Sequence, residues 1–145
     1  MATDHPLEIV NTRVFSYPPD AVFAAFSDPE KLATWWGPEG FTSTFSEFDF
    51  RVGGEWVFVL HGPDGTDYPN HSRFTGVAPQ RSIVLEHLSS GHEFTMTMLY
   101  EDLGGRTRLT WQMVLPKEKE ELRGFITQAN EQNFDRLEAC LKRSS

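Results

Sequence analysis

The chain has 145 residues, a formal net charge of −8 and a single cysteine, Cys140. This length predicts one domain, residues 1–145, with a core of its own, and one cysteine excludes an internal disulfide and a cysteine-rich metal site. The net negative charge and the lack of a run of Lys and Arg argue against nucleic-acid and membrane partners, because such partners are negatively charged. Because neither a signal peptide nor a membrane span is indicated, we expect a cytoplasmic protein.

The N-terminal part predicts a strand followed by two short helices. Residues 7–15 are rich in β-branched side chains, which favour a strand. Residues 21–26 are typical of a short helix with proline in its first turn. A second helix is expected to begin at Asp28, whose side chain can cap free backbone N–H groups, with Pro29 at the first helical position. It should end near residues 35–38.

From Phe41 onward the hydrophobic period changes to two, which indicates strands. Gly-rich and Pro-rich turns separate six such segments, which are residues 41–50, 55–61, 68–77, 82–88, 93–101 and 107–115. Six successive strands with short turns predict an antiparallel meander. Together with the first strand, the sheet should contain about seven strands.

After Pro116, about 25 residues follow the helical period. One stripe of this helix carries most of its apolar side chains: Phe125, Ile126, Ala129, Leu137 and Cys140. Charged and polar side chains occupy the opposite side, so the helix should be amphipathic and lie on the sheet. The predicted fold class is therefore α+β.

An ordered set of segments resembles one protein family over nearly the whole chain. The matching segments are Asp28-Pro29-Glu30-Lys31-Leu32, Trp35-Trp36-Gly37-Pro38, Arg51-Val52-Gly53-Gly54-Glu55-Trp56, Pro63-Asp64-Gly65, residues 100–109 and Asp135-Arg136-Leu137. The chain resembles the START-like (SRPBCC) superfamily. More narrowly, it is similar to bacterial homologues of the C-terminal domain of the heat-shock-protein-90 ATPase activator.

This resemblance implies the helix-grip fold, in which a curved antiparallel sheet packs its concave face over a long C-terminal helix. Two short helices complete that fold, and no cofactor is implied. Many relatives carry a Gly-Trp pair in the last helix where this chain has Ala129-Asn130. The shape of any pocket must therefore follow from this chain's own residues.

Strand parity predicts which side chains face the last helix. They are aromatic residues, aliphatic residues and flexible methionines, and they would either fill a solid core or line a cavity open to a ligand. The predicted ligand-binding residues are Trp36, Phe41, Trp56, Phe58, Phe74, Leu85, His87, Met96, Met98, Trp111, Met113, Phe125, Ile126, Ala129, Asn130 and Asn133.

Three polar side chains stand out among these apolar positions. Asn130 and Asn133 fall on the sheet-facing side of the helix, and a buried amide without partners costs about 1–3 kcal/mol. They should therefore bond either to sheet side chains such as His87 or to a polar group of a ligand. His87 is the only histidine expected to face inward, and it could be a satisfied core residue, a ligand anchor or an acid/base.

Three further interpretations concern the tryptophans, possible metal ligands and the single cysteine. We expect one of Trp35 and Trp36 in the core and the other at the mouth of the cavity. His61 and His71 could approach each other across the hairpin at residues 62–67, but two exposed histidines do not make a metal site. Cys140 should be a small buried residue rather than a nucleophile.

Three functions fit these patterns. The leading hypothesis is a monomer or weak homodimer that binds a small hydrophobic or aromatic molecule between the sheet and the C-terminal helix. The resemblance also allows an enzyme of the polyketide-cyclase or hydrolase type with His87 as acid or base, although we find no catalytic motif. A chaperone ATPase co-regulator ranks last, because the larger activators have an additional N-terminal domain that 145 residues cannot contain.

Overall fold

A computed structural model describes residues 6–89 and 93–144. Its elements follow the predicted order of a strand, two short helices, six strands and a long helix. In chain order they are β1 (Leu7–Phe15), α1 (Pro19–Ser27), α2 (Pro29–Trp35), β2 (Thr42–Phe48), β3 (Glu55–His61), β4 (Asp67–Ala78), β5 (Ser82–His87), β6 (Phe94–Asp102), β7 (Thr107–Leu115), η1 (Lys117–Leu122) and α3 (Arg123–Ser144).

The seven strands form one antiparallel sheet in the order β1-β7-β6-β5-β4-β3-β2. Strands β2 to β7 make the predicted meander, and β1 pairs with β7 along its whole length, from Leu7 opposite Leu115 to Phe15 opposite Thr107. Register shifts between Phe45 and Glu47 and between Phe74 and Gly76 interrupt the ladders. Such bulges increase the local twist, which favours a curved sheet.

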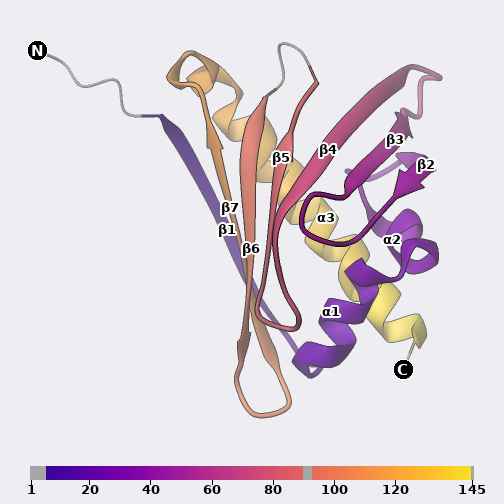
Figure 1. Ribbon diagram of the computed structural model, residues 1–145, viewed down its shortest axis with the longest axis vertical. Helices are drawn as coiled ribbons and strands as arrows, with labels where there is room; N and C mark the ends of the chain where they lie inside the picture. The colour runs from indigo at the N-terminus through magenta and orange to yellow at the C-terminus, as the bar shows by residue number, and fades with distance from the viewer. Residues whose placement is uncertain (1–5, 90–92, 145) are drawn as a thin grey trace, which may run out of the picture.

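All three α-helices lie on one side of this sheet, and α3 crosses it diagonally (Figure 1). α1 and α2 contact each other and α3. The predicted start of α2 is confirmed, because the Asp28 side chain accepts a hydrogen bond from the Glu30 backbone N–H at 3.0 Å and Pro29 follows it. The architecture is therefore the predicted α+β helix-grip arrangement.

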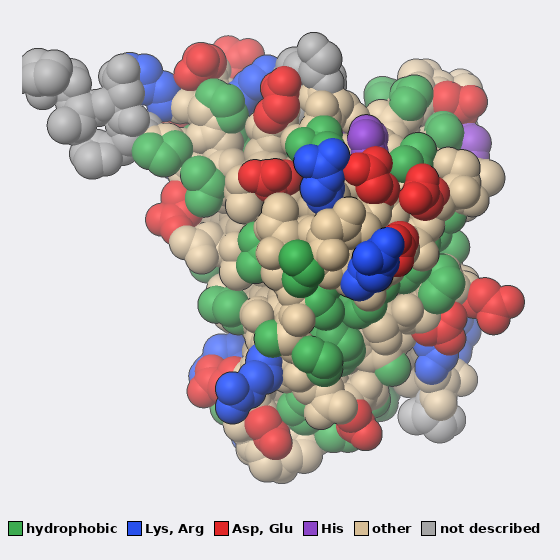
Figure 2. Space-filling model, viewed as in Figure 1, with side chains coloured by type: hydrophobic (Ala, Val, Ile, Leu, Met, Phe, Trp, Pro, Cys, Tyr) green, Lys and Arg blue, Asp and Glu red, His purple; other side chains and the backbone are tan. Residues whose placement is uncertain are grey.

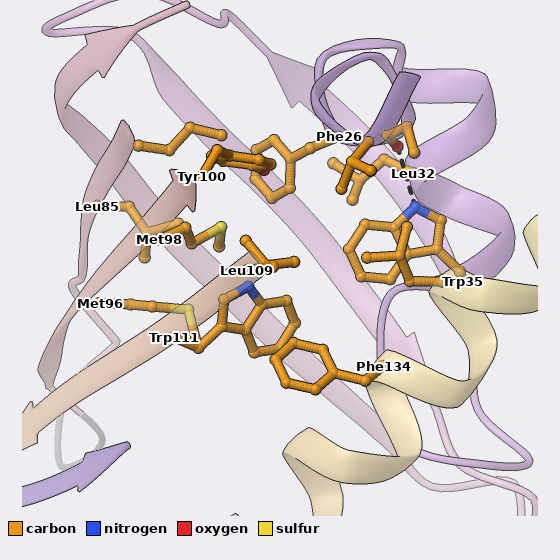
Figure 3. Close-up of a cluster of buried hydrophobic side chains, with 14 of the residues drawn as sticks. Phe26, Leu32, Trp35, Leu85, Met96, Met98, Tyr100, Leu109, Trp111 and Phe134 are labelled. Atoms are coloured by element: carbon orange, nitrogen blue, oxygen red, sulfur yellow. Dashed lines mark hydrogen bonds between the residues drawn. The ribbon is translucent and has the colours of Figure 1, made fainter. Parts of the chain in front are cut away.

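The core fills most of the space between α3 and the sheet. Phe134 projects from α3 toward Trp111 of β7 (Figure 3), and their ring centroids lie 4.7 Å apart. Trp35 of α2 is buried beside them and donates its indole N–H to the Ala25 carbonyl oxygen at 2.9 Å. The strand parities are confirmed, since residues assigned to the inward sets, from Trp56 on β3 to Met113 on β7, are buried or packed against the core.

The beginning of the last helix differs from the prediction. A 3₁₀ turn, η1, precedes α3, and Phe125 in the first turn of α3 is 71% exposed rather than on the buried stripe. The stripe is confirmed further along, where Leu137 and Cys140 are buried. Periodicity gave the direction of the stripe but not the point at which the helix begins to lie over the sheet.

The face seen in Figure 2 mixes acidic, basic and apolar side chains over the sheet. Positive charge is not gathered into one patch on this face. Among the described residues, the helices are all too short or too polar to cross a membrane.

Candidate functional site

A pocket of about 160 Å³ lies between α3, the corner after α2 and strands β3 to β6. Most of its wall is aromatic or aliphatic, and a few amide, hydroxyl and imidazole groups interrupt that wall. It is lined by Trp36, Gly37, Pro38, Trp56, Phe58, Leu60, Asn70, Ser72, Leu85, His87, Phe94, Met96, Ala129, Asn130 and Asn133. We call this the inner pocket.

A wider groove of about 490 Å³ adjoins the inner pocket. It is lined by Pro38, Phe41, Leu60, Asp67, Tyr68, Pro69, Asn70, His87, Phe94 and Phe125. Five residues line both spaces: Pro38, Leu60, Asn70, His87 and Phe94. The outer groove, as we call it, therefore lies beside the inner pocket and shares part of its wall.

The corner after α2 is held against α3 by Arg136. Its Nη1 donates to the carbonyl oxygens of Gly37 and Pro38, each at 3.0 Å, and its Nη2 donates to that of Thr34 at 3.2 Å. Burial lowers the pKa of this guanidinium, with the nearby Arg143 charge acting in the same direction. These bonds join two of the matched sequence segments and fix one wall of the pocket.

Glycine is required at this corner. Gly37 has φ = +110°, and a Cβ at this position would lie 2.9 Å from Cδ2 of Leu60. Its backbone N–H donates to Oδ1 of Asn133 at 3.2 Å. Residue 37 therefore ties α3 to the corner from both its N–H and its carbonyl oxygen.

Asn130 is anchored on the other side of α3, by strand β1. Its Nδ2 donates to Oδ1 of Asn11 at 3.0 Å and lies 3.5 Å from the sulfur of Met113. Asn11 in turn donates to the Thr127 carbonyl oxygen and to Glu131, at 3.2 and 2.8 Å. Asn130 therefore bonds to a sheet side chain, as one of the two expectations held, but the partner is Asn11 and not His87. Asn133 bonds instead to the backbone of Gly37.

His87 is 8% exposed and lies at the junction of the inner pocket and the outer groove. Its ring stacks on Phe94 with centroids 4.8 Å apart, and its Nε2 lies 2.7 Å from Oδ1 of Asn70. Because Nδ2 of Asn70 donates to the Tyr68 carbonyl oxygen, Oδ1 must accept and Nε2 must carry a proton. Nε2 is therefore a donor and does not serve as a base in this arrangement.

One of the two adjacent tryptophans lies in the core as expected, but the other lines the inner pocket and not the outer groove. Trp35 is 1% exposed and lies in the core, whereas the partly buried Trp36 lines the inner pocket. Trp36 packs against Trp56, with ring centroids 5.1 Å apart. Within the described residues, the buried indole N–H groups of Trp56 and Trp111 have no acceptor, so each costs free energy that ring packing must offset.

The structure separates the predicted ligand-binding residues into three groups. Nine line the inner pocket: Trp36, Trp56, Phe58, Leu85, His87, Met96, Ala129, Asn130 and Asn133. Phe41 and Phe125 line the outer groove. The other five pack into the core and line neither space: Phe74, Met98, Trp111, Met113 and Ile126.

Sequence reasoning missed the polar residues that β4 contributes. Asn70 and Ser72 share the parity of the buried Phe74, so alternation along β4 places all three on the inner face. The sequence did carry a signal for these site residues, because polar side chains occupy strand positions that alternation places on the inner face. Leu60 and Phe94 also line the inner pocket. They share strand faces with the predicted residues Phe58 and Met96 but were not themselves predicted as site residues.

Two other histidines bond to carboxylates. His61 lies 2.8 Å from Oδ1 of Asp67 and 2.8 Å from Oγ1 of Thr44, and His71 contacts Glu55. Hydrogen bonds from His71 and Arg73 lower the pKa of Glu55. In the part of the chain that the structure describes, no cluster of three His, Cys, Asp or Glu side chains could hold a metal ion.

Solved structures from several bacteria share this fold. A solution structure from Arthrobacter aurescens superposes with a TM-score of 0.87 at 23% identity, over 94% of this chain and 87% of that one. A crystal structure from Chromobacterium violaceum superposes with a TM-score of 0.82 at 27% identity, over 92% of this chain and 96% of that one. The crystal structure of the AHSA1 protein from Silicibacter pomeroyi superposes with a TM-score of 0.81 at 26% identity, over 96% of this chain and 100% of that one.

An antiparallel sheet that grips a long C-terminal helix defines a helix-grip protein of the START-like class. The sequence model of one family, described as Activator of Hsp90 ATPase homolog 1-like protein, matches residues 16–142. The chain belongs to this family, as its resemblance predicted. Among proteins with curated descriptions, none matches it.

Proposed function

We propose that this protein binds a small hydrophobic molecule between its sheet and α3. The observation that carries the proposal is a mostly apolar inner pocket beneath α3 that shares five lining residues with the outer groove. An apolar ligand would enter from solvent through the outer groove and reach the space beneath α3. Concave sites lined by aromatic side chains with a few polar groups are typical of small-molecule sites.

The dimensions support a ligand with at least one ring. An engineered apolar cavity of about 150 Å³ in another protein accepts benzene, and the inner pocket measures about 160 Å³. The outer groove, at about 490 Å³, adds room for a larger apolar portion. Phe41, Tyr68 and Phe125 would contact that portion.

The test is a titration with the neutral fluorescent probe N-phenyl-1-naphthylamine, whose emission rises in an apolar site. Ala129 lines the inner pocket, so Ala129→Phe places a ring in that space and should raise the Kd at least about tenfold, a loss of about 1.4 kcal/mol. Ala139 is exposed on the same helix. Ala139→Phe is therefore the matched control and should bind as the wild type does.

Saturable binding to the wild type and to Ala139→Phe, but not to Ala129→Phe, would support the proposal. Equal binding by all three proteins would place the probe elsewhere and contradict it. Thermal unfolding of each variant shows whether a loss of binding comes from a loss of fold.

A further inference from the structure

The two asparagines of α3 that line the inner pocket each have one side-chain atom engaged by the protein. Asn133 uses Oδ1 to accept from the Gly37 N–H, and Asn130 uses Nδ2 to donate to Asn11. Within the described residues, Nδ2 of Asn133 and Oδ1 of Asn130 make no hydrogen bond. The side chains are only 6% and 7% exposed, so α3 offers the pocket one unpaired donor and one unpaired acceptor.

The neighbouring groups determine which end of each asparagine amide is oxygen and which is nitrogen. The Gly37 N–H can only donate, so the atom of Asn133 that faces it must be oxygen. Asn11 donates through Nδ2 to Thr127 and Glu131, so its Oδ1 is the atom left to accept from Asn130. The donor and the acceptor are therefore fixed by their neighbours.

The described residues that line the inner pocket include no Lys, Arg, Asp or Glu. His87 is its one ionisable side chain, and the Nε2 of His87 already donates to Asn70. Asp67 of the outer groove is bound by His61. A ligand charge carried into the inner pocket would lose its hydration without gaining an ion pair, which is strongly unfavourable.

A hydroxyl group matches these features, and the aromatic wall of the inner pocket favours a hydroxyl carried on a ring. A hydroxyl on an aromatic ring is uncharged at neutral pH, and it both donates and accepts a hydrogen bond. Asn130 and Asn133 are three residues apart on α3, so their Cβ atoms are about 5–6 Å apart. A hydroxyl oxygen that bonds to both amides would lie about 2.7–3.0 Å from each. An ether or ketone would use only the donor of Asn133.

We propose that the inner pocket recognises a neutral phenolic ring, whose hydroxyl donates to Oδ1 of Asn130 and accepts from Nδ2 of Asn133. The ring lies among the aromatic side chains of the inner pocket, and a substituent para to the hydroxyl extends into the outer groove. This inference rests on the proposed function, because it names the ligand class of the same site.

The test compares three compounds of similar shape by displacement of N-phenyl-1-naphthylamine. They are 4-butylphenol, 4-butyltoluene, which replaces the hydroxyl by a methyl group, and 4-butylbenzoate, which carries a charge. The measured quantity is the ratio of the Kd for 4-butyltoluene to the Kd for 4-butylphenol. A mutation that changes the shape of the pocket should alter both Kd values alike, so such an effect cancels in their ratio.

Asn133→Leu and Asn130→Leu should each lower this ratio about tenfold, the effect of one buried hydrogen bond. Gln128→Leu makes the same change at an exposed position of α3 and should leave the ratio unchanged. Affinity for 4-butyltoluene reports whether each variant keeps an intact pocket. The two asparagine variants are independent, so one that fails to fold leaves the other as the test.

A ratio that is unchanged in the folded asparagine variants would overturn the phenol assignment. Tighter binding of 4-butylbenzoate than of 4-butylphenol would also overturn it. In both cases the displacement itself would still support a hydrophobic pocket. If neither the probe nor any of the three compounds binds, the proposed function fails together with the inference.

Discussion

Replacing Arg136 with methionine tests whether the corner after α2 is held in place by α3. The guanidinium bonds to three carbonyl oxygens, those of Thr34, Gly37 and Pro38. Two of these bonds share Nη1, and the bond to Thr34 is exposed, so their contributions do not simply add. Methionine keeps much of the apolar stem but leaves these carbonyl groups without the charged donor.

A hydrogen bond to a charged group contributes about 1.5–3 kcal/mol to stability. Because the side chain is only partly buried, we expect Arg136→Met to lower the free energy of unfolding by about 2 kcal/mol. That corresponds to a fall in Tm of about 4–8 °C for a chain of this size. Because Trp36 and Pro38 belong to this corner, affinity for N-phenyl-1-naphthylamine should fall as well.

Chemical and thermal unfolding followed by circular dichroism measure the change. Arg143 is exposed on the same helix, and Arg143→Met should change stability by less than about 0.5 kcal/mol, as most surface substitutions do. If Arg136→Met is as stable as Arg143→Met and binds the probe equally well, the corner does not depend on Arg136.

Three other substitutions test the core, the corner and the pH response. Phe134→Ala removes a fully buried ring that packs on Trp111 and should cost about 3–5 kcal/mol in urea unfolding; a cost below about 1 kcal/mol would contradict the packing. Gly37→Ala puts a Cβ at φ = +110° and against Leu60, so calorimetry should show a loss of about 1–3 kcal/mol. Burial raises the pKa of Tyr100 well above 10. The folded state then keeps the proton that the unfolded state loses, so stability falls by about 1.4 kcal/mol per pH unit as the pH rises above 10. Tyr100→Phe should reduce that slope, and an unchanged slope would show that Tyr100 is not its source.

The prediction from sequence was reliable where local geometry leaves little choice. Side chains alternate along a strand wherever no bulge interrupts it, and the inward sets that include Trp56 and Trp111 are buried as parity requires. Asp28 followed by Pro29 predicted the beginning of α2 because capping is a local interaction. The error at Phe125 arose where a helical stripe was extended into a turn of α3 that the sheet does not cover.

The partners of the buried amides could not be predicted in this way. Asn11 meets Asn130 across 119 positions of the chain, and Gly37 meets Asn133 across 96. Each contact depends on where α3 crosses the sheet and on the pairing of β1 with β7, which is set by the packing of the whole core. A sequence pattern shows that an amide faces inward but not which group it will find there.

The sequence alone determined the order of the elements, the α+β class and the side of each strand that is buried, because periodicity, capping and turn chemistry act over a few residues. The family followed from the resemblance of an ordered set of sequence segments. Tertiary structure decided how the inward side chains divide between solid core and pocket. Phe74 and Phe58 are both inward aromatic residues of neighbouring strands, yet only Phe58 lines the inner pocket. That difference depends on how closely α3 and the Arg136-bound corner approach each strand, which no local pattern encodes.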